Sequence, residues 1–163
     1  MKAPPMNDKL THIDEKGDAR MVDVGGKAIT ARSATAIGRV LMQSQTLNLI
    51  KQQQVKKGDV LQIAQLAGIM AAKQTPNLIP LCHPLSLNAV EVTLGLSDEP
   101  IAVMVEATCR LDGKTGVEME ALTAVSIACL TVYDMLKAVD KNMVIDQIYL
   151  TEKTGGKSGN WSF

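Results

Sequence analysis

The sequence predicts an α+β fold in which helices pack on one face of an antiparallel sheet. Residues 85–96 and 101–111 alternate apolar and polar side chains with a period of two, which is typical of paired strands. Residues 60–71 and 117–139 instead repeat apolar side chains at helical spacing. The chain has 163 residues, a length suited to one domain with a single core.

The first half of the chain predicts one strand and two helices. Residues 27–42 are rich in small and β-forming side chains and predict a long strand. Ser44 is the predicted N-cap of a helix that runs to about Gln54. Asp59 is expected to cap the next helix, and Pro76 is expected to end it.

The second half predicts a hairpin, a long helix and a last strand. Residues 97–100 (Ser-Asp-Glu-Pro) form the expected hairpin turn, and 112–116 form a loop before the helix at 117–139. Residues 143–151 predict the last strand. The resulting order is β-α-α-β-β-α-β, which is the ferredoxin-like plan with an extra helix before the hairpin.

The two ends of the chain lack periodic patterns. We predict a flexible N-terminal arm over residues 1–20, a single domain over 21–153 and a flexible Gly- and Ser-rich tail over 154–163. The arm has two open interpretations: it has no function, or it folds over a site or a neighbouring subunit.

Composition excludes several classes of protein. The 17 basic residues balance the 17 acidic ones, and only four residues are aromatic, which argues against a nucleic-acid binder. Three widely spaced cysteines without a Cys-x-x-Cys motif argue against a disulfide scaffold, a structural zinc or an iron–sulfur cluster. No uninterrupted apolar run is long enough to span a membrane, so we expect a cytoplasmic protein.

The long helix predicts a homo-oligomer. Between Ala121 and Tyr133 its only polar residues are Thr123, Ser126 and Thr131, which lie on different sides of the axis. A helix that is apolar on nearly every side must be covered on nearly every side. We therefore expect a second subunit to cover part of it.

Asp134 and Lys137 are the first candidates for chemistry. They stand three residues apart, so they share a helix face where the apolar run ends. In a poorly solvated cleft, a carboxylate and an amine can shuttle protons, each tuning the pKa of the other. The alternative is an ordinary solvated surface pair.

His83 lies between two prolines in Pro80-Leu81-Cys82-His83-Pro84, which favours an extended course. It could act as an acid or base, or serve a structural role. Glu118 and Glu120 stand near the start of the long helix, where acidic residues also favour the helix dipole. Basic residues at predicted loop edges, together with Arg32 and Arg110 in predicted strands, could form a phosphate site if they converge, and the alternative for each lysine is a solvated surface position. The lysines are Lys57, Lys73, Lys114, Lys153 and Lys157.

Several strings resemble one family. The most specific are 78–85 (LIPLCHPL) and 113–122 (GKTGVEMEAL), and shorter ones lie at 10–13, 21–24, 57–60, 67–69, 133–135 and 155–159. Over about residues 10–159 the chain resembles the cyclic pyranopterin monophosphate synthase (MoaC) family of molybdenum-cofactor biosynthesis. No motif position departs from the family pattern in a way that suggests loss of activity.

The resemblance implies a fold, an assembly and a reaction. The fold is ferredoxin-like, and the assembly is a homohexamer, a trimer of dimers with sites at subunit interfaces. The substrate is the cyclised dihydro-GTP made by the preceding radical GTP cyclase. A phosphorus–oxygen lyase of this family converts it by acid–base catalysis to cyclic pyranopterin monophosphate and releases pyrophosphate. The resemblance implies no metal or redox cofactor, although magnesium could accompany the triphosphate.

The resemblance also implies roles for individual residues. Asp134 is the implied catalytic acid/base, with Lys137 beside it. The implied substrate contacts are Leu81, Cys82, His83, Met119 and Glu120. The implied pocket-lining residues are Glu118, Lys57, Lys73, Arg32, Lys153 and Lys157.

Three other functions remain open alternatives. A regulatory module on this fold would bind a nucleotide without releasing pyrophosphate. A structural subunit of a cofactor-assembly complex would tolerate the loss of Asp134. A cyclohydrolase-like GTP hydrolase would usually need a set of zinc ligands that the sequence lacks.

Overall fold

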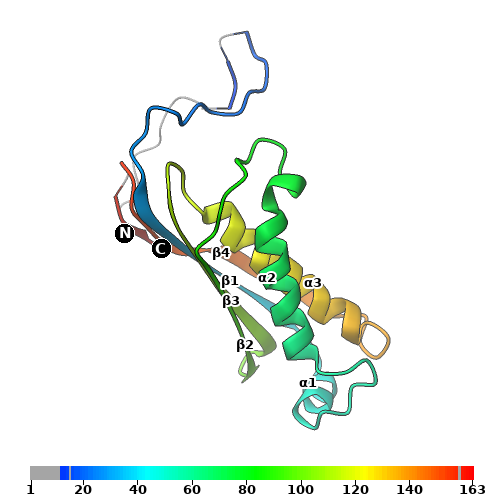
Figure 1. Ribbon diagram of the computed structural model, residues 1–163. Helices are drawn as coiled ribbons and strands as arrows, with labels where there is room; N and C mark the ends of the chain where they lie inside the picture. Colours follow the sequence, from blue (N-terminus) through cyan, green and yellow to red (C-terminus); the bar gives the residue numbers. More distant parts are fainter. Residues whose placement is uncertain (1–11, 15, 158) are drawn as a thin grey trace.

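The computed structural model describes residues 12–14, 16–157 and 159–163. Its elements are β1 Thr30–Leu41, α1 Ser44–Lys51, α2 Val60–Leu78, β2 Ala89–Asp98, β3 Ile101–Gly113, α3 Glu118–Leu136, β4 Val144–Thr154 and β5 Trp161–Ser162. The strands form one antiparallel sheet in the order β2-β3-β1-β4-β5. The two long helices α2 and α3 cover one of its faces (Figure 1). The predicted α+β class, the ferredoxin-like plan and the order of the first seven elements are confirmed.

The centre of the sheet is β1, which pairs with β3 on one side and β4 on the other. Glycine is unfavourable inside a strand, and Gly38 shows why this position needs it. A Cβ atom there would lie 2.6 Å from Cγ1 of Val125 and 3.3 Å from Sγ of Cys129. The missing side chain therefore lets α3 lie directly on the strand.

The core is built around α3, which packs on α2, β1, β3 and β4. Seven of its residues are fully buried: Ala121, Ala124, Val125, Ala128, Cys129, Val132 and Leu136. By length and composition α3 could cross a membrane, but 56% of the apolar stretch that gives it this property is buried in the core of the fold. The composition that predicts a second subunit is thus explained largely within one chain, by α2 and the sheet.

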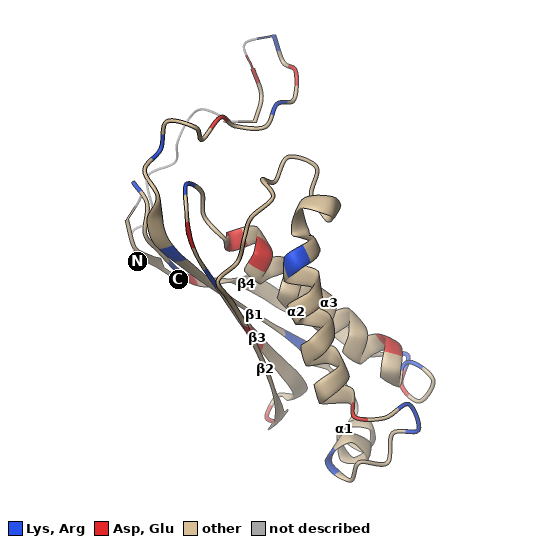
Figure 2. Cartoon of the chain, in the orientation of Figure 1, with Lys and Arg blue, Asp and Glu red and all other residues tan. Residues whose placement is uncertain are grey.

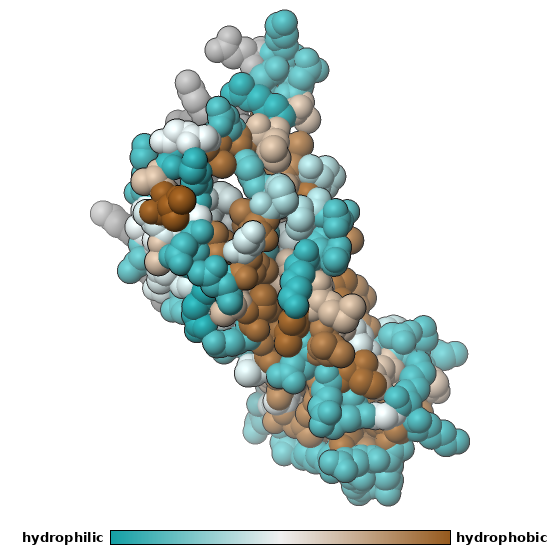
Figure 3. Space-filling view, viewed as in Figure 1, coloured by the Kyte–Doolittle hydropathy of each residue, from teal (hydrophilic) through white to brown (hydrophobic). Residues whose placement is uncertain are grey.

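Apolar residues without a cover lie on α3 at Leu130, which is 53% exposed, and as a row on α2. Ile63, Leu66 and Met70 recur at three- and four-residue spacing, and each is exposed by 43% or more. In Figure 3 hydrophobic residues run along the middle of the molecule, and hydrophilic residues gather at its two ends. This apolar stripe favours an oligomer.

The start of α1 differs from its prediction. Gln43 occupies the N-cap, without a side-chain cap, and the helix ends at Lys51 rather than Gln54. The carboxylate of Asp140 serves the helix instead: it accepts from the backbone N–H of Gln43 at 3.0 Å and from Oγ1 of Thr46 at 2.9 Å. A cap supplied from about a hundred residues away leaves no local sequence signal.

In α2 one predicted boundary is confirmed and the other is wrong. The carboxylate of Asp59 accepts from the backbone N–H groups of Leu61 and Gln62, as expected for an N-cap. Pro76 does not end the helix but lies inside its last turn. It removes the N–H that would bond to the carbonyl of Ala72, and Oγ1 of Thr75 donates to that carbonyl at 3.0 Å.

Three other boundaries shift by a few residues. β2 begins at Ala89 rather than 85, and its pairing with β3 starts at Ala89 and Arg110. Leu136 ends α3, rather than 139, because the N–H groups of residues 139 and 140 both turn back to its carbonyl. β4 spans Val144–Thr154, three residues beyond the predicted end.

The end of the chain is more ordered than its composition predicts. Trp161 and Ser162 pair with β4, and the ring of Phe163 lies 4.9 Å from the ring of Tyr149. Strand pairing and contacts between aromatic rings thus hold the last residues after the glycine-rich stretch. Thr154 still belongs to β4, the flexibility of residues 155–157, 159 and 160 stays a prediction, and residue 158 lies outside the described residues. In the arm, residues 1–11 and 15 lie outside the described residues.

Candidate functional site

A pocket of about 290 Å³ opens at the N-terminal end of α3. The loop between α2 and β2 supplies one wall, and the loop after β3 with the first turn of α3 supplies the other. It is lined by His12, Leu81, Cys82, His83, Leu85, Thr115, Gly116, Glu118, Met119 and Glu120. We call it the His83 pocket. It brings together six of the residues singled out from the sequence.

The side chain of His83 has a defined tautomer. Its Nε2 atom lies 2.7 Å from the carbonyl oxygen of Val22. Because a carbonyl oxygen can only accept, Nε2 must carry the hydrogen. In the neutral ring Nδ1 is then the acceptor that remains free to meet a ligand.

Glu120 is the most buried acid of the His83 pocket, with only 2% of the residue exposed. Burial, and secondly the charge of Glu118, raise the pKa of its carboxyl group. Burial, and secondly the charge of Glu120, also raise the pKa of the Cys82 thiol. The Glu120 carboxyl and the Cys82 thiol therefore keep their protons to a higher pH than the same groups in water, and in the protonated form each can donate a hydrogen bond to a ligand.

Basic residues surround the same end of the molecule. Nζ of Lys153 lies 2.8 Å from Oε1 of Glu118, and both side chains are about 30% exposed. Nε of Arg32 donates to the carbonyl of Gly113 at 3.0 Å, which ties β1 to the loop before α3. Gly156 packs against the guanidinium of Arg32, so the exposed Lys157 follows close by.

Lys73 lines a second hollow beside the His83 pocket. Its walls are Ile69, Lys73, Leu85, Leu87, Asn88, Ala89 and Val90. Leu85 belongs to both hollows, so they adjoin. A ligand longer than the His83 pocket could reach the ammonium of Lys73 across this side chain.

Asp134 and Lys137 form a separate cluster at the C-terminal end of α3, which we call the Asp134 cluster. Nζ of Lys137 lies 2.6 Å from Oδ1 of Asp134. Nζ of Lys57, from the loop before α2, lies 3.6 Å from Oδ2 and donates to the backbone carbonyl of Asp134 at 2.8 Å. One carboxylate thus lies between two ammonium groups.

The two ammonium groups determine the charge of the pair. The hydrogen bond from Lys137, followed by the charges of Lys137 and Lys57, lowers the pKa of Asp134. The same hydrogen bond raises the pKa of Lys137. The expectation of a poorly solvated cleft does not hold within one chain, because the side chains of Asp134 and Lys137 are 60% and 54% exposed.

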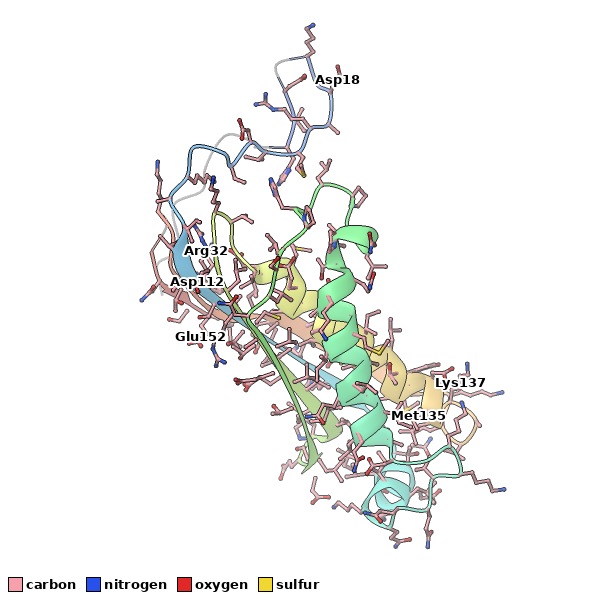
Figure 4. The ribbon with its side chains drawn as sticks, viewed as in Figure 1. Asp18, Arg32, Asp112, Met135, Lys137 and Glu152 are labelled. Carbon is pink, nitrogen blue, oxygen red and sulfur yellow. The ribbon has the colours of Figure 1, made fainter. Side chains whose placement is uncertain are left out.

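The Asp134 cluster and the His83 pocket lie at opposite ends of α3. With a rise of 1.5 Å per residue, Glu118 and Asp134 are separated by about 24 Å along the helix. Figure 4 shows Lys137 at the end of the molecule opposite to Arg32, and Figure 2 shows charged residues at both ends of a largely uncharged pair of helices. One chain alone therefore does not unite the two groups of predicted site residues.

Some residues of these sites have no assigned role in the sequence interpretation. His12 lines the His83 pocket, and the backbone carbonyl of Val22 positions His83. Asp140 anchors the turn after the Asp134 cluster. The string 10–13 resembles a family motif, but only the fold shows that the arm reaches the pocket. Among the described residues, no three His, Cys, Asp or Glu side chains are grouped as ligands for one metal ion.

Comparison with known proteins identifies close relatives. A sequence model of the MoaC family matches residues 21–156. A protein of Parvibaculum lavamentivorans is 63% identical over 153 residues, which cover 94% of this chain and 96% of the relative. A protein of Heliobacterium modesticaldum is 60% identical over 154 residues, which cover 94% of this chain and 97% of the relative. A protein of Streptomyces avermitilis is 57% identical over 159 residues, which cover 98% of this chain and 92% of the relative. All three relatives are named cyclic pyranopterin monophosphate synthase.

Proposed function

We infer that this chain, which belongs to the MoaC family, is a cyclic pyranopterin monophosphate synthase of molybdenum-cofactor biosynthesis. Its substrate is a cyclised dihydro-GTP, and its products are cyclic pyranopterin monophosphate and pyrophosphate. Within the structure, the His83 pocket is the observation that supports this assignment. Leu81, Cys82, His83, Met119 and Glu120 come from two separate segments and line this one cavity.

The His83 pocket fits the purine-derived part of such a substrate. Leu81 and Met119 offer apolar surface, and Glu118 and Glu120 offer carboxyl groups to the N–H groups of a guanine-like edge. The nearby cations of Arg32, Lys73, Lys153 and Lys157 fit the triphosphate. They would stabilise the charge that develops on departing pyrophosphate.

We assign the acid–base steps to the Asp134 cluster. Closure of a cyclic phosphate joins a hydroxyl oxygen of the substrate to the α-phosphorus, expels pyrophosphate and requires an acceptor for the hydroxyl proton. Asp134 is held ionised by Lys137 and Lys57, so its carboxylate can accept a proton, and either ammonium group can donate one. This chemistry corresponds to a phosphorus–oxygen lyase that works by acid–base catalysis.

The positions of the two groups favour a site shared between copies of the chain. The Asp134 cluster is too far from the His83 pocket to act on a ligand bound there by the same chain. In a homohexamer built as a trimer of dimers, the Asp134 cluster of one copy can meet the His83 pocket of another. The exposed stripe of Ile63, Leu66 and Met70 on α2 provides apolar surface for such contacts.

The proposal has three further parts. The substrate comes from a preceding radical GTP cyclase, and the reaction takes place in the cytoplasm. The chemistry consists of proton transfers and phosphoryl chemistry, so the protein needs no redox cofactor. A magnesium ion can accompany the triphosphate as part of the bound substrate.

One assay tests the assignment. The purified protein is mixed with anaerobically prepared cyclised dihydro-GTP, and pyrophosphate and pterin are measured together. We expect the two products in equal amounts. Binding of the nucleotide without pyrophosphate would instead identify a regulatory module and overturn the enzyme assignment. The same assay with a chelator tests whether a metal ion takes part.

A further inference from the structure

We propose that His12 is a further substrate-binding residue, held over the His83 pocket by an N-terminal strap. The strap consists of residues 12–14 and 16–25. This inference rests on the proposed function, because it concerns the ligand of the same pocket. With this role, the described part of the N-terminal arm is more than a connecting segment.

The strap is attached to both walls of the His83 pocket. The carbonyl oxygen of Val22 accepts from Nε2 of His83 at 2.7 Å, on the wall between α2 and β2. The carbonyl oxygen of Gly25 accepts from Nζ of Lys114 at 2.7 Å, on the loop after β3. The carboxylate of Asp23 accepts from the N–H of Gly25 at 2.7 Å and fixes the turn between the two contacts.

The outer part of the strap folds back on itself as a small hairpin. The N–H of Arg20 donates to the carbonyl of His12 at 3.0 Å, and Ile13 forms a bridge with Ala19. At the tip, Oδ1 of Asp14 accepts from the N–H groups of residues 16 and 18 at 2.9 Å. His12 therefore stands opposite Arg20 at the base of the hairpin, and Arg20 leads directly into the segment that contacts His83.

The imidazole of His12 complements the other groups of the pocket. His12 lines the same cavity as Glu118, Met119 and Glu120. The carboxylate of Glu118, which pairs with Nζ of Lys153, binds the N–H groups of a guanine-like ring but not its oxygens, because an ionised carboxylate is only an acceptor. An imidazole can donate, so His12 binds an oxygen acceptor of the substrate.

The test compares His12→Ala with Lys16→Ala, a matched change on the exposed side of the same hairpin. Removal of one hydrogen bond to the bound substrate should raise KM about tenfold and leave kcat nearly unchanged, because the contact is the same in the ground state and transition state. Lys16→Ala should keep both constants. His12→Asn retains an N–H donor and should recover part of the lost affinity. Thermal melting of each variant checks that the fold is intact.

The outcomes separate this inference from the proposed function. If the unaltered protein forms pterin and pyrophosphate but His12→Ala keeps its KM, the role of His12 is overturned and the enzyme assignment stands. The role is equally overturned if Lys16→Ala raises KM as much as His12→Ala. If the unaltered protein releases no pyrophosphate, the enzyme assignment itself fails.

Discussion

The ammonium group of Lys57 donates a hydrogen bond to the backbone carbonyl of Asp134 at 2.8 Å. The same ammonium lies 3.6 Å from the Asp134 carboxylate. Lys57 thus closes the last turn of α3 and also adds a positive charge beside its acid. The loop before α2 and the end of α3 form one unit, and this unit carries the first prediction.

Asp134→Asn and Lys137→Ala should each lower kcat at least about a hundredfold, the low end for the loss of a general acid or base. The ion pair is exposed, so its removal should leave the fold and the assembly unchanged. Steady-state kinetics and size-exclusion chromatography measure the two effects. Lys141→Ala, a change of an exposed lysine on the following turn, is the control. Near-normal turnover of either variant would remove the proposed catalytic pair.

Asp140 should be a major support of the same end of the molecule. Burial alone would raise its pKa, but hydrogen bonds from Gln43, Thr46 and Asn142 lower the pKa overall. Its stabilising effect is therefore present above the pKa of the unfolded chain and is lost as the pH falls through the lower folded pKa. Asp140→Asn should lower Tm most at neutral pH and progressively less in acid.

Thermal melts at a series of pH values measure this effect. Asp98→Asn, which alters an exposed ion pair with Lys51, should change Tm little at any pH. A loss of Tm in Asp140→Asn that stays constant from neutral to acidic pH would show that the charge of Asp140 has no part in it.

The sequence predicts those parts of the fold that depend on local patterns. The hairpin, α3 and the Asp59 cap follow from periodicity and from a residue type at one position. The place of Pro76 inside α2 and the cap of α1 do not follow from local patterns. A neighbouring hydroxyl bonds to the carbonyl that Pro76 leaves without its usual partner, and the distant Asp140 caps α1. Residue types within the site are predictable from the family motifs. The separation of the His83 pocket from the Asp134 cluster is not, because it depends on the length and direction of α3.

Gly38→Ala should destabilise the fold by about 1–3 kcal/mol, the usual cost of adding volume to a well-packed core. The new methyl group would press on Val125 and Ile148, which cannot move without disturbing α3 or β4. Denaturant unfolding measures the difference. Gly95→Ala is the matched control, because it lies in β2 with no atom within 4 Å of the new Cβ. It should leave the stability unchanged or raise it slightly.

Glu120→Gln should make the stability of the protein less sensitive to an increase in pH above the ordinary pKa of a glutamate. Burial raises the pKa of Glu120, so the folded protein keeps this proton at pH values where the unfolded chain has lost it. Stability then falls as the pH rises from the unfolded pKa to the folded pKa, by at most about 1.4 kcal/mol per pH unit. The variant lacks this loss, so its Tm should rise relative to the unaltered protein as the pH increases above about 4, the ordinary pKa of a glutamate.

The exposed Glu106→Gln provides the comparison for this pH series. It should follow the unaltered protein throughout. If the Glu120→Gln and unaltered curves run parallel over the same range, burial does not hold a proton on Glu120.

The separation of about 24 Å along α3 makes a prediction about mixed assemblies. If each site takes its His83 pocket from one copy and its Asp134 cluster from another, two inactive variants can restore each other. His83→Ala keeps an intact Asp134 cluster, and Asp134→Asn keeps an intact His83 pocket. In assemblies formed by equal coexpression, about a quarter of the sites would combine the two intact halves, because each half comes at random from either variant. The activity of the mixture should therefore reach about a quarter of that of the unaltered protein, far above either variant alone.

Asp134→Asn coexpressed with Lys137→Ala is the matched control: both changes damage the same half, so no site is restored. Activity of the His83→Ala and Asp134→Asn mixture that stays at the level of the separate variants would place both halves of the site within one chain, against the geometry of α3.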